Sequence, residues 1–168
     1  MSINNPELTF EIVYQDEHLL QVEIKASNGR YAGITTFYIN PDGKELIEFG
    51  EKLRGFPKKI GQTIRQEFGY TQKELDELKL HDSGLKTVMY YAGLYFSCID
   101  KNGHTAVDLV LLENNWAERD EARGKASFEL RFDPASLDQF VQELIDVGKS
   151  KEGKATLRGY FDNKDVYG

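Results

Sequence analysis

Hydrophobic and polar residues alternate along much of this chain, which is the pattern of a β-strand with one buried face. The alternation is clean over residues 8–15 and again over residues 20–26. Because the polar pair Asp16-Glu17 lies between these runs, we predict two antiparallel strands joined by a turn. A third strand is predicted over residues 31–39, where apolar, β-branched and aromatic residues occur at both odd and even positions and so on both faces of the strand. Such a composition favours an interior position in the sheet.

Two helices are predicted where apolar residues recur every three or four positions. The first covers residues 46–53, between the Asn-Pro-Asp-Gly stop at residues 40–43 and the Gly-Phe-Pro sequence at residues 55–57. The second begins at Asp133-Pro134, where aspartate can cap the helix and proline suits its first position, and it ends at Gly148. Both helices share a Leu-x-x-Phe-x-x-x-Leu spacing, as Leu46, Phe49 and Leu53 and as Leu137, Phe140 and Leu144.

A β-hairpin over residues 90–112 is the central prediction, because Asn102-Gly103 separates two apolar runs. Asn-Gly is typical of a two-residue type I′ turn, which needs positive φ at both positions. If Lys101 faces His104 across this turn, the register of the hairpin follows. One face is then apolar and the other is mixed, so we expect the hairpin to be covered on both sides. The predicted pairs are Cys98 with Val107, Phe96 with Leu109, Leu94 with Leu111, Ser97 with Asp108 and Tyr95 with Val110.

Residues 57–85 carry weaker patterns. Ile60, Ile64 and Phe68 fit one side of a short helix. A capping-box sequence at residues 71–74 favours a further short helix, although a strand over residues 78–81 is an open alternative.

Three further segments complete the chain. Residues 113–124 are polar and aperiodic, which predicts a long loop. Residues 125–132 alternate cleanly and predict a strand. Residues 155–161 predict a final strand at the edge of the sheet.

These elements together predict an α+β fold, in which a mainly antiparallel β-sheet packs against two principal helices. At 168 residues the chain has the length of one ordinary domain, so we expect residues 1–168 to form a single domain. Three strands and a helix occur in residues 8–56 and again in residues 86–148. Either a βββα unit is duplicated, or the similarity arises because strand-to-helix junctions commonly contain Asp, Asn and Pro and amphipathic helices commonly contain Leu and Phe at these spacings.

The charge of the chain narrows the classes of partner. Acidic residues outnumber basic ones, 28 to 21, which argues against nucleic acid, because binding a phosphate backbone relies on clustered Lys and Arg. No apolar run approaches the roughly 18 residues of a membrane-spanning helix, and the first residues lack the pattern of a signal peptide. We therefore expect a cytoplasmic protein that binds neither nucleic acid nor membrane.

Motifs of common catalytic and metal sites are missing from the sequence. The three histidines form neither HxH nor HExxH spacing, and there is no nucleophile elbow, phosphate-binding loop or dinucleotide fingerprint. Cys98, the single cysteine, is predicted to be a small buried hydrophobe. Asp100 and Asp108 are predicted on opposite faces of the hairpin, where they cannot cooperate as acid and base. We therefore expect no catalytic residues, no metal site and no cofactor.

The predicted loop at residues 113–124 is the best candidate for binding a partner. It holds the single tryptophan among several acidic residues, and an aromatic anchor ringed by charge is typical of interface hot spots. The alternative is that Trp116 pins the loop to the core while the acidic residues are solvent-exposed. The predicted partner-binding residues are Glu113, Asn115, Trp116, Glu118, Asp120 and Glu121.

The order of these parts resembles small bacterial immunity proteins of polymorphic toxin systems, the WapI-type group, and similar uncharacterised bacterial domains. The resemblance covers residues 8–148 and rests on the GRYAGITTFY strand, Pro41 followed by LxxFxxxL, the central hairpin and the closing FELRFDPASLDQFVQELIDVG segment. It implies a non-catalytic inhibitor that binds a toxin domain. The acidic balance is compatible with a basic partner, such as a nuclease domain.

Two alternatives from other classes stay open. One is a small-ligand-binding protein or enzyme with a pocket between sheet and helices, lined by Tyr31, Tyr38, Tyr90 or Tyr95. A filled interface between sheet and helices would argue against it. The other is a homo-oligomer in which exposed strand edges pair.

We expect Trp116→Ala, combined with charge reversal at Glu118 and Asp120, to weaken partner binding with little loss of thermal stability. The reason is that an exposed aromatic anchor contributes to the complex and not to the fold. Binding titrations and thermal melts measure the two effects separately. A large fall in melting temperature would show instead that Trp116 is structural.

Overall fold

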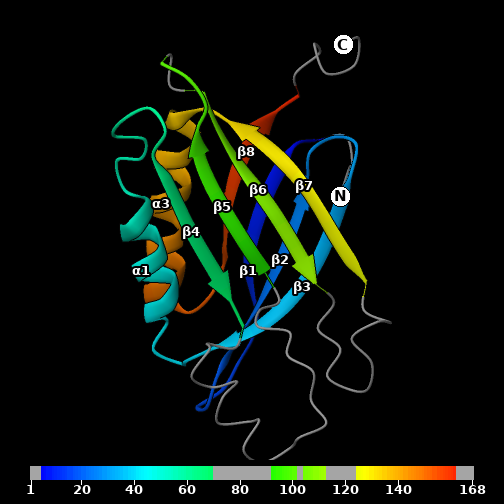
Figure 1. Ribbon diagram of the computed structural model, residues 1–168. Helices are drawn as coiled ribbons and strands as arrows, with labels where there is room; N and C mark the ends of the chain where they lie inside the picture. The colour runs from blue at the N-terminus through cyan, green and yellow to red at the C-terminus, as the bar shows by residue number, and fades with distance from the viewer. Residues whose placement is uncertain (1–4, 70–91, 102–103, 113–123, 162–168) are drawn as a thin grey trace, which may run out of the picture.

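The computed structural model of the chain describes residues 5–69, 92–101, 104–112 and 124–161. Within these ranges it has one antiparallel sheet of eight strands in the order β3-β2-β1-β8-β7-β6-β5-β4, together with two helices (Figure 1). The predicted α+β fold is therefore confirmed. The elements are β1 (Glu7–Gln15), β2 (Leu20–Ser27), β3 (Ala32–Ile39), α1 (Lys44–Leu53), β4 (Thr63–Phe68), β5 (Ala92–Cys98), β6 (Thr105–Leu112), β7 (Lys125–Phe132), α3 (Pro134–Ser150) and β8 (Lys154–Tyr160).

The sheet is folded into two four-stranded halves that face each other. In Figure 1, β4 to β7 lie in front and β1 to β3 lie behind, with α1 and α3 side by side along one flank. The halves are joined where β7 meets β8, through the pairs Arg131 with Tyr160 and Phe132 with Gly159. Because this junction is short, side-chain packing must hold the two halves of the sheet together.

Phenylalanine rings fill the space between the two halves and the helices. Phe10, on β1, has ring centroids of Phe37, Phe49, Phe68 and Phe140 at 5.6 to 6.4 Å. These rings come from both halves of the sheet and from both helices, and all are buried. Aromatic pairs at such distances add about 0.5–1.5 kcal/mol each beyond the area they bury. The rings therefore tie together elements that share few backbone hydrogen bonds.

A second contact between the halves forms where β3 crosses the ends of β6 and β7. The Thr35 hydroxyl donates a hydrogen bond to the carbonyl oxygen of Leu112. A Cβ built at Gly33 would lie 2.6 Å from the Cβ of Ala126, closer than two such atoms can approach. Glycine at position 33 is therefore required for the close approach of the two backbones.

The two halves of the chain repeat one order of elements. Three strands, a helix and a fourth strand occur as β1 to β4 with α1, and again as β5 to β8 with α3. The fourth strand of each unit pairs with the first strand of the other, since β4 pairs with β5 and β8 pairs with β1. The buried residues of both units form one hydrophobic cluster.

The two helices pack at very short range through glycine. A Cβ built at Gly148 would lie 2.7 Å from Cγ1 of Ile47, so this residue serves the contact between α1 and α3. The predicted end of the second helix at Gly148 is therefore wrong. The helix continues to Ser150, and Lys151 follows in a left-handed conformation with φ of 62°. Neither helix in the described ranges has the length and hydrophobicity that crossing a bilayer requires.

The predicted hairpin forms, but its register differs by two residues from the prediction. The backbone N–H of Ile99 donates to the carbonyl of His104 at 2.7 Å, so His104 pairs with Ile99 and not with Lys101 as predicted. Because the difference is even, Phe96 and Leu109 still share the core face. The second face is partly exposed and not covered as expected. The observed pairs are Cys98 with Thr105, Phe96 with Val107, Leu94 with Leu109, Ser97 with Ala106 and Tyr95 with Asp108.

Strand β4 replaces the short helix predicted through Ile60, Ile64 and Phe68, so that prediction is wrong. A spacing of four keeps Ile64 and Phe68 on one face of a strand as well as of a helix. Ile60 is exposed, and Gly61 leads into the strand with a positive φ of 80°. The alternatives for residues 71–81 fall outside the described residues.

The positions of two strands in the sheet also differ from the prediction. Strand β3 was expected in the interior and lies at an edge, whereas β8 was expected at the edge and lies between β1 and β7. Local hydrophobicity cannot report which strands become neighbours, since that depends on the exchange of fourth strands between the units. Cys98 is buried as predicted, with its thiol donating to the carbonyl oxygen of Asp100 at 3.4 Å.

We expect Gly33→Ala to destabilise the fold by about 1–3 kcal/mol, because the added methyl group overlaps Ala126. Ala126→Gly in the same chain removes the overlapping atom and should recover part of this loss. Urea unfolding of both single variants and the double variant measures the coupling, which we expect to be about 1 kcal/mol. Strictly additive effects would contradict the close approach of β3 to β7.

Candidate functional site

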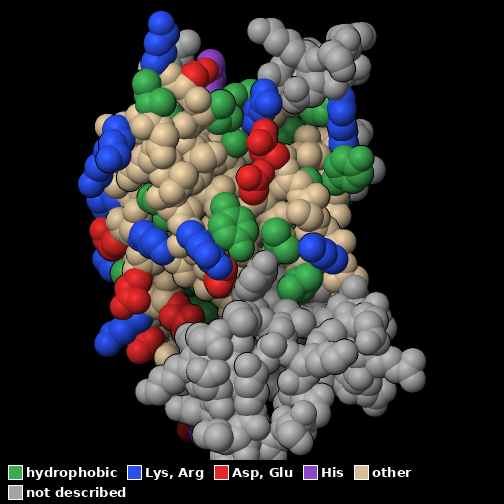
Figure 2. All heavy atoms as spheres, in the orientation of Figure 1, with side chains coloured by type: hydrophobic (Ala, Val, Ile, Leu, Met, Phe, Trp, Pro, Cys, Tyr) green, Lys and Arg blue, Asp and Glu red, His purple; other side chains and the backbone are tan. Residues whose placement is uncertain are grey.

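The outer face of β4 to β7 carries charged and polar residues from all four strands. The register places Arg65, Tyr95, Asp108 and Glu129 in one row across these four strands. Figure 2 shows this face, on which acidic, basic and hydrophobic side chains are interspersed. Inward-facing residues of the same strands are committed to the core. Any contact with a partner by these strands must therefore use the outer row.

Asp108 and Glu129 form a like-charge pair at the centre of this row. They are directly opposite each other on β6 and β7, an arrangement that destabilises an antiparallel pair. Partial burial and the nearby Glu129 carboxylate raise the pKa of Asp108 above its usual value. Glu129 is compensated by Arg131, whose Nε lies 3.0 Å from its carboxylate. No ion pair to Asp108 occurs within the described ranges.

The neighbouring charges of the row neutralise one another. Arg65 Nε donates to the carboxylate of Glu67 at 2.8 Å, and the Tyr95 hydroxyl donates to the same oxygen at 3.3 Å. The guanidinium of Arg65 also lies 5.6 Å from the centroid of the Tyr95 ring. Asp108 is thus the charge of the row that these contacts do not compensate.

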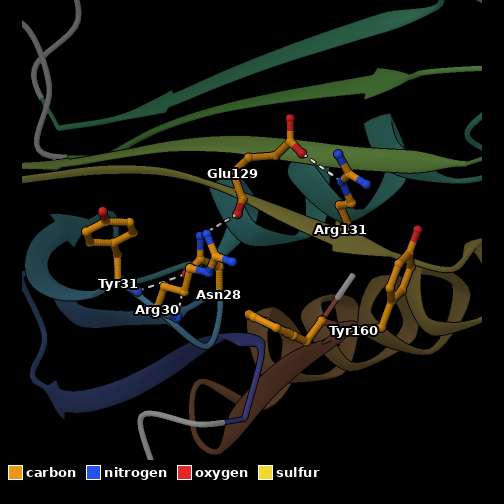
Figure 3. A pocket seen from close by; sticks show the side chains of 7 residues that line it. Asn28, Arg30, Tyr31, Glu129, Arg131 and Tyr160 are labelled. Atoms are coloured by element: carbon orange, nitrogen blue, oxygen red, sulfur yellow. Dashed lines mark hydrogen bonds and ion pairs between the residues drawn. The ribbon is translucent and has the colours of Figure 1, made fainter. Parts of the chain in front are cut away.

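A hollow of about 210 Å³ adjoins this row where β7 separates from β8 (Figure 3). Asn28, in the turn between β2 and β3, anchors one wall. Its side-chain oxygen accepts hydrogen bonds from the backbone N–H groups of Arg30 and Tyr31 at 2.9 Å each. Its side-chain nitrogen donates to the carbonyl oxygen of Glu129 at 3.0 Å. One side chain therefore both shapes the turn and fixes it to β7.

Besides Asn28 and Glu129, the hollow is lined by aromatic and arginine residues: Arg30, Tyr31, Arg131, Tyr160 and Phe161. The guanidinium of Arg30 lies 5.4 Å from the centroid of the Phe161 ring. Tyr31 is 65% exposed, so most of its ring is available for contact. Tyrosine and arginine are enriched in the energetically dominant parts of protein interfaces.

The predicted partner-binding residues Glu113, Asn115, Trp116, Glu118, Asp120 and Glu121 lie outside the described residues. Their segment joins the end of β6 at Leu112 to the start of β7 at Lys125, so it leaves and re-enters at one end of the candidate face.

The tyrosines proposed to line a pocket between sheet and helices do not do so where they are described. Tyr31 and Tyr38 are exposed, and Tyr95 lies on the outer face. Tyr90 lies outside the described residues. The phenylalanine cluster fills the interface that such a pocket would need.

Sequence analysis missed Arg30, Glu129, Arg131 and Tyr160 as candidate residues. Asp108 was recognisable from the sequence as a carboxylate in an otherwise apolar run, although the predicted register placed it opposite Ser97. Its opposition to Glu129 depends on the register across residues 113–124, which no local pattern fixes. The described chain holds no group of three or more potential metal ligands.

Comparisons with protein-family models, with curated proteins and with solved structures found no match for this chain. The candidate surface is therefore interpreted from its own residues.

We expect Asp108→Asn to stabilise the fold at pH 7 by about 0.2–1 kcal/mol, because it removes a like-charge cross-strand contact. A carboxyl whose folded pKa is raised favours the folded state below its unfolded pKa and loses that contribution as pH rises through the folded pKa. The gain from Asn should therefore vanish below about pH 4. Unfolding curves at both pH values, with the exposed Asp138→Asn as control, test this. An equal gain at low pH would contradict the charge explanation.

Proposed function

We propose that this chain is a non-catalytic, cytoplasmic protein-binding module that neutralises a bacterial toxin domain, in the manner of an immunity protein. The contact surface would be the outer face of β4 to β7 together with the adjoining hollow. The single observation that carries this proposal is the like-charge pair of Asp108 and Glu129 on an exposed sheet face. Such a pair costs stability in the free protein and is relieved when a partner supplies a cation.

The charge of the whole chain supports a basic partner. With a formal net charge of −7, the protein attracts a basic domain over long range, and the Asp108 carboxylate offers it a specific contact. Lysine or arginine of the partner, placed beside Asp108, would pair with a carboxylate that the described chain leaves without an ion pair. The charge balance and the local geometry thus favour the same kind of partner.

The hollow supports recognition of a protein side chain. Tyr31 and Tyr160 provide apolar ring surface, and Glu129, whose carboxylate is turned towards Arg131, also lines the hollow (Figure 3). The segment with Trp116 is joined to β6 and β7 at the end of the same face. A partner that covers the face could therefore also contact the residues predicted from the sequence.

Small-ligand binding is the second candidate function, because the hollow exists and carries Arg30 beside aromatic rings. Ligand pockets usually measure about 300–1,000 Å³, so a hollow of about 210 Å³ fits a drug-sized molecule poorly. It is large enough for one side chain of a partner. A thermal-shift screen with small carboxylates and aromatic acids tests this alternative directly.

The arrangement of potential catalytic groups supports a role without chemistry. The ring of His104 contacts the carboxylate of Asp100, and the thiol of Cys98 is buried and donates to the Asp100 carbonyl. Each group is thus engaged by Asp100 and neither activates the other as a nucleophile and base would require.

The test is to produce, in a bacterial host, the C-terminal domain of the secreted protein encoded beside this chain. We expect that domain to arrest growth, and we expect this chain to restore growth and to form a stoichiometric complex with it. Neighbouring genes without such a protein, or a toxic domain that this chain neither binds nor neutralises, would refute the proposal.

Within that complex, Asp108→Lys should weaken binding by about 10-fold or more, since it replaces an attraction for a basic partner by repulsion. Glu48→Lys, at an exposed position of α1, changes the net charge equally and should have a much smaller effect. Calorimetric titration of both variants measures the difference. Equal weakening would show that net charge alone steers the partner and that the outer face is not the contact.

A further inference from the structure

The two edge strands of the sheet, β4 and β3, differ in the features that prevent pairing with another chain. Edge strand β4 carries the charged residues Arg65 and Glu67, and Lys52 of α1 donates a hydrogen bond to the carbonyl oxygen of Arg65. Charged residues and a covering helix are ordinary means of keeping an edge from pairing with another chain. Edge strand β3 lacks such charges, since residues 31–40 contain no charged side chain. In the described part of the chain no strand pairs with its free side.

The outward residues of β3 are suited to pairing. Hydrogen-bonded pairs alternate along an antiparallel ladder, and Asn28 pairs with Tyr31 at the turn. The backbone groups of Ala32, Ile34 and Tyr38 therefore point away from β2. The side chains of Ile34 and Tyr38 are 55% and 49% exposed, although β-branched and aromatic residues stabilise a sheet best when they contact a cross-strand neighbour.

We propose that β3 pairs with β3 of a second copy of this chain, antiparallel about a two-fold axis, so that one sheet runs through the dimer. In this arrangement Ile34 of each copy faces Tyr38 of the other. An isologous contact of this kind closes on itself and leaves neither β3 edge exposed.

The distribution of charge is compatible with a second copy as the chain that pairs with β3. Two acidic chains repel each other over most of their surface, but they can approach at a strip that carries no charge, such as residues 31–40. The same antiparallel arrangement brings the turn that holds Arg30, before β3, towards the turn that holds Asp42 of the other copy, after β3, once at each end of the contact. Both side chains are exposed and neither forms an ion pair within the described ranges.

The first test compares Ile34→Lys with Ile60→Lys by sedimentation velocity over a range of concentrations. Both isoleucines are exposed, at 55% and 60%, but Ile60 lies outside the sheet, so the two variants change charge equally. We expect the unaltered chain to be dimeric, Ile34→Lys to raise the dissociation constant about 10-fold or more, and Ile60→Lys to leave it nearly unchanged. Thermal melts should show that both variants remain folded.

A second test fixes the register. In a Cys98→Ala background, a mixture of Ile34→Cys and Tyr38→Cys chains should form a disulfide-linked dimer under oxidation more readily than either chain alone. A chain that stays monomeric up to about 1 mM, where even a very weak complex would form, would overturn the proposal. So would a dimer that Ile34→Lys leaves intact, or one in which either cysteine variant links to itself as readily as to the other. These variants lie away from Asp108, so failure here is distinguishable from failure of the proposed toxin contact.

Discussion

The structure depends on the packing of phenylalanine rings between two halves of a folded sheet. Among the described residues the halves share just two backbone-paired positions, those of β7 and β8, so the ladder alone does not hold them together. Phe10 contacts rings from β3, β4 and both helices, and thereby joins every layer of the molecule. A close-packed interior of this kind leaves little room for a ligand. The functional surfaces must therefore be sought on the outside, which is where the uncompensated Asp108 and the exposed Tyr31 lie.

The exchange of fourth strands explains why the two units form one body. Each unit has three strands and a helix of its own, but its last strand completes the other unit's half of the sheet. Glycines at the contact between α1 and α3 bring these two helices, one from each unit, into close contact. Neither unit can bury its own inner face without the other. The hollow beside Glu129 follows from the same geometry, because β8 leaves β7 after a short junction and the Asn28 turn takes its place.

Side-chain parity could be predicted from the sequence, whereas register and neighbours could not. The alternating pattern placed Phe96 and Leu109 on the correct face even though the hairpin differs by two residues, because an even difference preserves parity. The same parity could not distinguish helix from strand for Ile64 and Phe68, whose spacing suits both. Of the candidate site, Asp108 was recognisable as a carboxylate in an apolar strand. Its opposition to Glu129 depends on residues 113–124, whose length and composition do not set a register.

Packing in the core explains the residues at the inward positions of β3 but not those at its outward positions. Its inward positions are constrained, since Gly33 must pass Ala126, Thr35 bonds to Leu112 and Phe37 joins the ring cluster. Its outward positions carry no such requirement and could hold lysine or glutamate, as the outward positions of β4 do. They carry instead the β-branched and aromatic residues of an interior strand, which is why the sequence predicted an interior position. A further strand beside β3 would explain why an edge strand has the composition of an interior one. Strand β3 of a second copy would supply such a strand, and it would bring no charged side chain into the contact.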